Sequence, residues 1–287
     1  MRRGLTLGVA ACLFLSVGAV ASLASGCGSS DAGGNPGDPD AAQPAPDADA
    51  SDPGLDAGAD TTVAKDAGRE AAPADQRYCN KLVPKPKFCD DFDDGDLKND
   101  WDVSTVLSGS IIDIDDTMST SAPFSYVVAT PKLTTQVNAN ASLRKTVVGA
   151  VSHVKYSFSA FFPAVTFDKG IIAIATLDVS ASHYFTLNLR DDDMTLPAAS
   201  LQEFVGGSVI RHLLTKVPPI NAWTRVVIDL DFGAGKANIS FDAAKALDNE
   251  TITPTPGTEA TVRLGAVYMD GPSDAFQANF DDVIVDF

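Results

Sequence analysis

Residues 153–161 read HVKYSFSAF, and apolar and polar side chains alternate in this stretch from residue 153 to residue 160. Successive side chains of an extended chain point to opposite faces, so all the apolar residues fall on one side. These are Val154, Tyr156, Phe158 and Ala160. A period of two predicts a half-buried β-strand, with one face toward a core and the other toward solvent.

The same period recurs in YFTLNLR at 184–190 and in TRVVIDLDF at 224–232. Further apolar runs lie at 110–114, 124–129, 141–148, 170–179, 201–205, 208–214, 237–241, 261–269 and 276–287. Turn residues separate many of these runs. About a dozen short strands, with hardly one stretch long enough for a three-turn helix, predict an all-β antiparallel β-sandwich. Only FDAAKALDNE, residues 241–250, allows a helical turn.

The N-terminal segment, residues 1–26, has the three parts of an export signal: two arginines, an apolar run and a string of small residues. The apolar run is too short and too rich in Gly and Ala for a membrane span. Residues 23–27 read LASGC and resemble the lipobox of bacterial lipoproteins. The resemblance implies cleavage before Cys27 and diacylation of its thiol. A simply cleaved signal and a free cysteine are the alternatives.

The lipobox resemblance also implies in which membrane the protein is anchored. In that family Asp at the second mature position favours the inner membrane, and residue 28 here is Gly. We therefore expect a lipid anchor in the outer membrane, with the rest of the chain facing the periplasm or the cell surface. Two or three acyl chains hold a protein firmly, whereas one chain holds it only marginally.

Residues 27–77 form a segment dominated by Asp, Ala, Gly and Pro, as in NPGDPDAAQPAPDADASDPGLDAGAD at 35–60. With almost no large apolar side chains, such a segment cannot bury enough surface to offset the entropy lost on ordering. We predict a disordered linker that acts as an extended acidic tether between the anchor and a folded domain at 78–287. The alternative is that its acidic residues bind a cation or a partner.

Charge and cysteine count narrow the function further. The formal net charge of −17 argues against nucleic acid as a partner, because binding phosphate needs a Lys and Arg surface. Of the four cysteines, Cys12 leaves with the signal and Cys27 is the expected anchor. Cys79 and Cys89 remain, and in an oxidising compartment they most simply form a disulfide.

Four stretches follow one another in an order that resembles the concanavalin A-like lectin/glucanase superfamily: FCDDFDDGDLKNDWDVS at 88–104, SAPFSYVVATP at 121–131, NAWTRVVIDLDF at 221–232 and FDDVIVDF at 280–287. The resemblance covers nearly all of residues 86–287. It implies a jelly-roll sandwich, and glycan recognition or polysaccharide cleavage on its concave sheet. Architecture does not decide between these activities, because one fold hosts many functions.

Candidate catalytic residues are sparse. The glucanase branch of that superfamily pairs carboxylates on an E-x-D-x-E strand for retaining chemistry, and nothing in this sequence matches that motif. Two aspartate pairs, Asp229 with Asp231 and Asp113 with Asp115, share a strand face, but we favour a solvated outer face for both. The lyase branch implies a histidine acting with Tyr184 and Arg190.

The histidines are the weaker part of that lyase hypothesis. They are three in number, they lie on separate predicted strands, and we expect ordinary surface positions for them: His153, His183 and His212.

The superfamily resemblance also implies one structural Ca²⁺ between the first and last strands, since hard cations prefer several oxygen ligands. Asp91 or Asp93 would then act with Asp281 or Asp282. Solvated turn acids are the alternative.

Sugar binding needs an aromatic platform beside planar hydrogen-bonding groups. One face of the predicted strand at 184–190 offers that combination in Tyr184, Thr186, Asn188 and Arg190, and the alternative is an ordinary polar outer face. The sequence therefore favours a surface-anchored lipoprotein whose sandwich binds carbohydrate without catalysis. A polysaccharide hydrolase or lyase with an atypical site, and a structural envelope protein, remain as alternatives.

Overall fold

The computed structural model describes residues 70–135, 137–163, 170–190 and 199–287. The predicted signal peptide at 1–26, the lipidation site Cys27 and most of the predicted tether lie outside these ranges. Within them the chain forms one short helix, α1 at Tyr78–Lys81, and fifteen strands. None of the described helical structure is long and apolar enough to cross a membrane.

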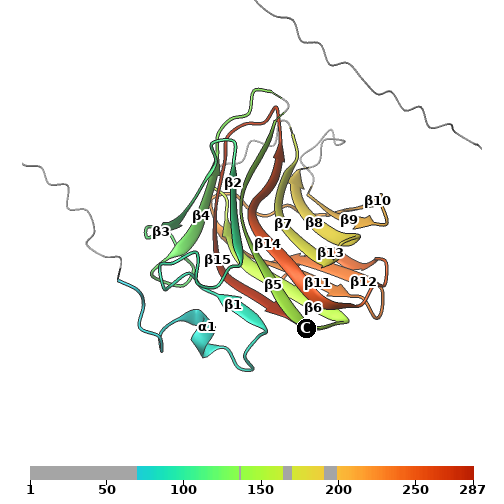
Figure 1. The fold of residues 1–287 in the computed structure, drawn as a ribbon, viewed down its shortest axis with the longest axis horizontal. Coiled ribbons are helices and arrows are strands. Elements are labelled where there is room, and N and C mark those ends of the chain that lie inside the picture. Colours follow the sequence, from blue (N-terminus) through green and yellow to red (C-terminus); the bar gives the residue numbers. More distant parts are fainter. Residues whose placement is uncertain (1–69, 136, 164–169, 191–198) are drawn as a thin grey trace, which may run out of the picture. The chain divides into compact units, whose positions relative to one another are not determined.

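The strands form two antiparallel sheets, which confirms the predicted all-β sandwich (Figure 1). Sheet A runs in the order β13-β12-β11-β6-β15-β4-β3, and β1 also pairs with β15. Its strands are β1 (Phe88–Asp90), β3 (Ile111–Asp115), β4 (Ser125–Thr130), β6 (His153–Phe161), β11 (Trp223–Asp231), β12 (Lys236–Phe241), β13 (Ala244–Thr251) and β15 (Phe276–Asp286).

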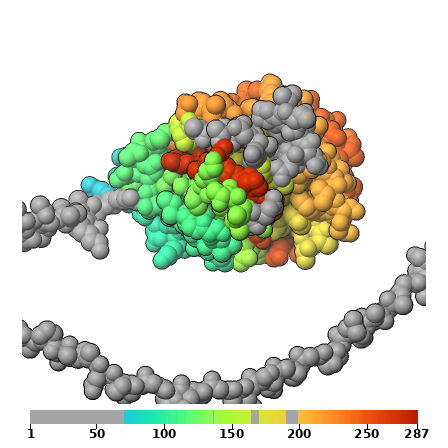
Figure 2. All heavy atoms as spheres, turned by 90° about the horizontal axis from the view of Figure 1, so that it is seen from above, coloured from blue at the N-terminus to red at the C-terminus, as the bar shows by residue number. Residues whose placement is uncertain are grey.

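Sheet B runs in the order β10-β9-β8-β7-β14-β5-β2. Its strands are β2 (Val103–Leu107), β5 (Asn138–Val151), β7 (Ile172–Ser180), β8 (His183–Arg190), β9 (Ser200–Val205), β10 (Ser208–Leu213) and β14 (Gly257–Asp270). Neighbouring strands are often distant in sequence, as where β14 lies between β5 and β7. Figure 2 shows residues of about 100–150 gathered at one end of the body and those of about 200–250 at the other.

The stretch HVKYSFSAF forms β6, which pairs with β11 on one side and β15 on the other. Its apolar set is fully buried, as the alternation predicts. Phe158 packs against Tyr156 and Phe280, with ring centroids 5.2 and 5.8 Å apart. These rings belong to one continuous core between the sheets, to which Phe185 and Leu187 of sheet B also belong.

The folded body begins before the predicted boundary at Tyr78. The backbone N–H of Ala72 donates to the carbonyl of Asp93, and the Arg77 side chain donates to the Ala72 carbonyl. Composition did not predict that this segment is ordered, because it is held by hydrogen bonds to the backbone, which do not require apolar side chains. The predicted disulfide between Cys79 and Cys89 is confirmed, with the two Cα atoms 5.7 Å apart.

The structure differs from the sequence analysis at two further places, one predicted wrongly and one not predicted. Residues 244–251 are strand β13, paired with β12, and not a helical turn. Asp242 has a φ of 53°, which fits a tight turn and lets the chain fold back on β12. Strand β2 was not predicted, because its side chains are mostly exposed and give no alternating pattern.

We predict that Phe158→Ala lowers the free energy of unfolding by about 3–5 kcal/mol, because it leaves a cavity in the middle of the aromatic core. Urea unfolding followed by circular dichroism measures the loss. The matched control is Val148→Ala, whose side chain is 77% exposed and should change stability by under about 0.5 kcal/mol. Equal losses for the two variants would mean that Phe158 is not part of a packed core.

Candidate functional site

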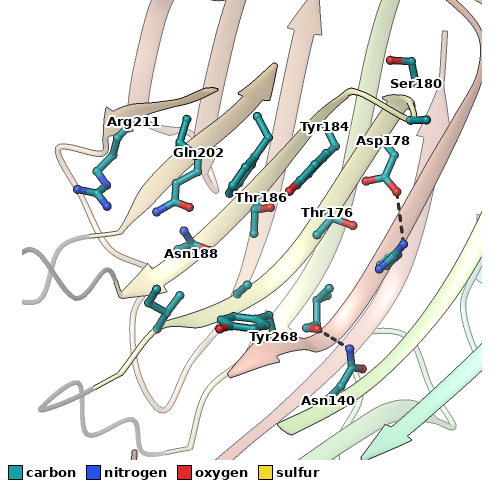
Figure 3. Close-up of a pocket in the computed structure, with 17 residues that line it drawn as sticks. Asn140, Thr176, Asp178, Ser180, Tyr184, Thr186, Asn188, Gln202, Arg211 and Tyr268 are labelled. Carbon is teal, nitrogen blue, oxygen red and sulfur yellow. Dashed lines mark hydrogen bonds and ion pairs between the residues drawn. The ribbon is translucent and has the colours of Figure 1, made fainter. Parts of the chain in front are cut away.

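The outer face of sheet B carries a groove with a cavity volume of about 990 Å³. Its lining residues come from β5, β7, β8, β9, β10 and β14 and from the turns beside them. Figure 3 shows the labelled side chains of Tyr184, Thr186 and Asn188 in a row along β8, with Gln202 and Arg211 on the two next strands. The groove therefore lies across the sheet, on the side away from the core.

Alternation along β8 explains why these side chains meet there. Phe185, Leu187 and Leu189 are buried in the core, so the residues between them must face the opposite side. Tyr184, Thr186 and Asn188 accordingly line the groove, and they share one face of the strand, as alternation predicts. The backbone of Arg190 pairs with Ile172, but the Arg190 side chain lies outside the described part of the structure.

Aromatic rings stand at two places in the groove. Tyr184 and Phe204 are directly opposite on β8 and β9, and their rings stack with centroids 4.4 Å apart and planes 8° apart. Tyr268 of β14 contributes a third ring, and Figure 3 places it across the strands from Gln202. Flat, partly exposed rings of this kind suit the C–H faces of sugars. Phe204 and Tyr268 were missed in the sequence, because only the strand order brings Phe204 beside Tyr184 and Tyr268 into the same groove.

Asn188 has unmet hydrogen-bonding capacity. It is 1% exposed, it lines the groove, and neither its Nδ2 nor its Oδ1 atom has a hydrogen-bond partner. Thr176 Oγ1, on the neighbouring strand and also in the groove lining, is buried without a partner as well. A buried polar group left unpaired costs about 1–3 kcal/mol, so such groups are expected to meet a ligand or an ordered water molecule.

The charged groups of the described groove lining are one aspartate and two arginines. Asp178 is the one acidic residue among the described lining residues, and its Oδ2 lies 3.5 Å from Arg263 Nη2. Burial raises the pKa of Asp178, and the positive charge of Arg263 partly opposes that rise. A carboxylate pair of the kind that glycoside hydrolysis uses is therefore absent from the described lining.

The aspartate pairs proposed from sequence lie elsewhere. Asp229 and Asp231 are on β11 in sheet A, where Asp229 Oδ1 is 2.6 Å from His153 Nε2 on the neighbouring strand β6. Asp113 and Asp115 are on β3, at the edge of the same sheet, where Asp115 Oδ2 accepts from Asn279 Nδ2. None of these four aspartates lines the groove.

The prediction of three surface histidines is wrong for two of them. His153 is exposed, but His183 and His212 are buried on the inner face of sheet B, and both contact Glu203. The register decides this, because His183 precedes Tyr184 and His212 follows Arg211, so each points away from the groove. The proposed combination of a histidine with Tyr184 and Arg190 therefore does not form from the described side chains.

The four aspartates of the calcium prediction gather where the segment after β1 meets β15. All four are buried, and burial raises the pKa of Asp93 and of Asp282, with a further rise from the Asp282 charge at Asp93 and from the Asp91 charge at Asp282. Their oxygens mostly accept protein hydrogen bonds: Cys79 N–H donates to Asp91, and the N–H groups of Thr120 and Ser121 donate to Asp281.

One oxygen in that cluster, Asp93 Oδ2, is buried without a partner. Even so, no group of three or more His, Cys, Asp or Glu side chains among the described residues is arranged to hold a metal ion. The calcium site at Asp91, Asp93, Asp281 and Asp282 gains no support from this geometry and stays a prediction.

Comparison with known proteins places the fold. No family model and no curated protein matches the sequence. The endo-β-1,4-glucuronan lyase of the fungus Trichoderma reesei superposes with a TM-score of 0.53 at 15% identity, over 70% of this chain and 95% of the lyase. The cellulose-induced protein Cip1 also superposes with a TM-score of 0.53, at 13% identity, over 69% of this chain and 96% of Cip1. At such identities the likeness shows a shared β-sandwich fold alone.

We predict that the free energy of unfolding falls as the pH rises from 6 to 8.5. Burial, reinforced by neighbouring carboxylates, raises the pKa of Asp90 and of Asp93 to about 7 and that of Asp281 to about 8. The folded chain then binds more protons than the unfolded chain between pH 4 and pH 8, so raising the pH destabilises it, by up to about 1.4 kcal/mol per pH unit for each group.

Urea unfolding at several pH values measures this slope. Asp93→Asn removes one of the titrating carboxyls and should flatten it, whereas Asp248→Asn, at an exposed side chain paired with Lys245, should leave it unchanged. Stability that rises toward pH 8.5 would contradict the prediction. Added Ca²⁺ that abolishes the slope in the unaltered chain would support the predicted cation site.

Proposed function

We propose that the groove on sheet B binds a carbohydrate chain without cleaving it. The observation that carries the proposal is the buried amide of Asn188, unpartnered at both polar atoms, on the same strand as the stacked ring of Tyr184. A sugar offers a partner to each group: its C–H faces pack on aromatic rings, and its hydroxyls donate to and accept from an amide.

The extent of the groove favours a chain of sugars over a single ring. Its lining spans six adjacent strands of sheet B, from β10 to β5. At a strand spacing of about 4.8 Å, six strands cover about 24 Å. Amide and hydroxyl side chains recur along that length, in Gln202, Asn188, Thr176 and Asn140 (Figure 3).

Binding without cleavage is favoured by which groups reach the groove. Hydrolysis needs two carboxylates, and the single acid of the described lining is already paired with Arg263. A lyase-like combination of histidine, tyrosine and arginine would need an imidazole in the groove, and the two histidines of sheet B face the core. The glucuronan lyase and Cip1 support a carbohydrate ligand only through the shared fold.

A glycan array probed with the mature chain tests the proposal, and each hit is then incubated and assayed for new reducing ends and for unsaturated products. We expect binding with neither product. Release of either product would replace the binding function with a hydrolase or a lyase. A chain that binds no glycan and cleaves none would favour the structural envelope protein.

We predict that Tyr184→Ala and Asn188→Ala each weaken binding of an array hit at least about tenfold, equivalent to about 1.4 kcal/mol, because they remove the platform and the amide. Isothermal titration calorimetry measures the change. Lys245→Ala, at an exposed residue of sheet A, is the control and should bind normally. Unchanged affinity for both groove variants would place the ligand elsewhere.

The second part of the proposal concerns where the protein is located in the cell. A lipid on Cys27 would hold the sandwich at the outer membrane, with the acidic segment between them acting as a spacer. The support is the stretch LASGC behind an export signal. A glycan-binding face carried on such a spacer would meet polysaccharide outside the cytoplasm.

We predict that Cys27→Ser moves the chain from the membrane fraction to the soluble fraction of a lipoprotein-processing bacterium, because the acyl acceptor is lost. Partitioning between water and Triton X-114 measures the shift. Cys12→Ser lies inside the expected signal and serves as the control, which should stay with the detergent. A Cys27→Ser chain that has lost residues 1–26 and still partitions into detergent would refute the lipid anchor.

A further inference from the structure

A buried carboxylate lies directly beneath the groove. Glu203 is fully buried on the inner face of β9. Its Oε1 accepts from the backbone N–H of Thr253 at 2.8 Å and lies 3.0 Å from His183 Nε2, and its Oε2 lies 3.4 Å from His212 Nε2. Burial acts to raise the pKa of Glu203, but the hydrogen bonds from Thr253 and His212 and the charge of His183 prevail and lower it.

These contacts link strands of sheet B to the end of sheet A strand β13, which backbone pairing within sheet B does not do. His183, Glu203 and His212 belong to β8, β9 and β10, which are adjacent in sheet B. Thr253 follows β13 of sheet A, and Glu250 of β13 has its Oε1 3.5 Å from His212 Nδ1. Strand β10 is one of the two edge strands of sheet B, and among the described strands it pairs only with β9. The cluster therefore ties an edge of sheet B to sheet A.

Every sheet B member of this cluster is the chain neighbour of a groove residue. His183 precedes Tyr184, Glu203 lies between Gln202 and Phe204, and His212 follows Arg211. Side chains at adjacent strand positions point to opposite faces, so the backbone that carries a buried member also carries its groove neighbour. The cluster and the groove are thus two faces of the same three strands.

From this arrangement we infer that Glu203 is a positioning residue: it fixes the β9–β10 hairpin so that the groove side chains of that edge stay aligned with Tyr184. The inference rests on the proposed function for its consequence in binding. A purely stabilising role is the weaker explanation, because apolar residues of similar volume often stabilise a core as well as buried charges do. A buried polar network instead specifies one arrangement, and in this one Glu203 is in contact with three partners while His183 Nδ1 has none.

Hydrogen exchange of the mature chain carrying Glu203→Gln tests the inference without any ligand. The amide that replaces the carboxylate has one acceptor oxygen, instead of two, for the Thr253 N–H and the two histidine rings, so the hairpin should loosen. We expect amides of residues 201–213 to exchange at least tenfold faster, while those of β6 and β11 in sheet A keep the rates of the unaltered chain.

Asp229→Asn is the matched control, since it removes the carboxylate from the other His–carboxylate contact, the exposed one between β6 and β11. It should leave residues 201–213 unchanged. His212→Gln keeps two of the three partners of Glu203 and serves as a second variant if Glu203→Gln does not fold. It should accelerate exchange in the same hairpin.

Binding of a glycan-array hit provides the second readout. Glu203→Gln should weaken it at least tenfold with every groove side chain intact. Exchange that is unchanged at 201–213, or that rises equally in β6 and β11, overturns the inference whatever the array shows. If the unaltered chain binds no glycan while the hairpin loosens selectively, the positioning role stands and the proposed function alone fails.

Discussion

Interdigitation of the two inner sheet faces is the constraint from which the rest of this molecule follows. In sheet A, Phe280 contacts Tyr126, Phe158 and Phe162, and these rings lie in the same core as Phe185 of sheet B. Because strand side chains alternate, the choice of which residues enter this core also decides which residues stand on the outer faces. A shift of β8 by one residue would put Tyr184 and Asn188 into the core and empty the groove.

That coupling gives the outer face of sheet B its particular character. Its groove combines stacked rings with amides and hydroxyls, and it places the buried amide of Asn188 among them without a protein partner. The inner face directly below carries a carboxylate and two histidines at positions where apolar residues would be expected. The two features together suggest that this edge of the sandwich is built for alignment of a surface and not for stability alone.

Much of the fold could be predicted from the sequence, because the decisive signal is local. Alternation in HVKYSFSAF and YFTLNLR identified β6 and β8 and the face that each buries, and the assignment of Cys12 and Cys27 to other roles left Cys79 and Cys89 as the disulfide pair. Strand β2 was missed because its own side chains are mostly exposed and give no alternating pattern. The ordered segment before Tyr78 was not predicted, because backbone hydrogen bonds hold it and leave no pattern in the sequence.

The site could be predicted from the sequence less completely than the fold, because its residues come together only through the order of the strands in the sheet. Tyr184, Thr186 and Asn188 could be found from one strand, but Phe204 and Tyr268 join them only through the strand order of sheet B. The burial of His183 and His212 likewise depends on Glu203, a partner 20 residues from one and nine from the other. Alternation along β8 places His183 on the same face as the buried Phe185, but no local pattern supplies the carboxylate partner that comes from another strand.

The most direct test of the account is the nuclear magnetic resonance signal of the Asn188 side-chain amide during titration with a glycan-array hit. If the groove binds sugar through its unpartnered amide, the two Nδ2 proton resonances of Asn188 shift progressively and saturate together with the ring signals of Tyr184. If the glycan binds while the Asn188 resonances stay in place, the ligand does not occupy this groove and the account is wrong.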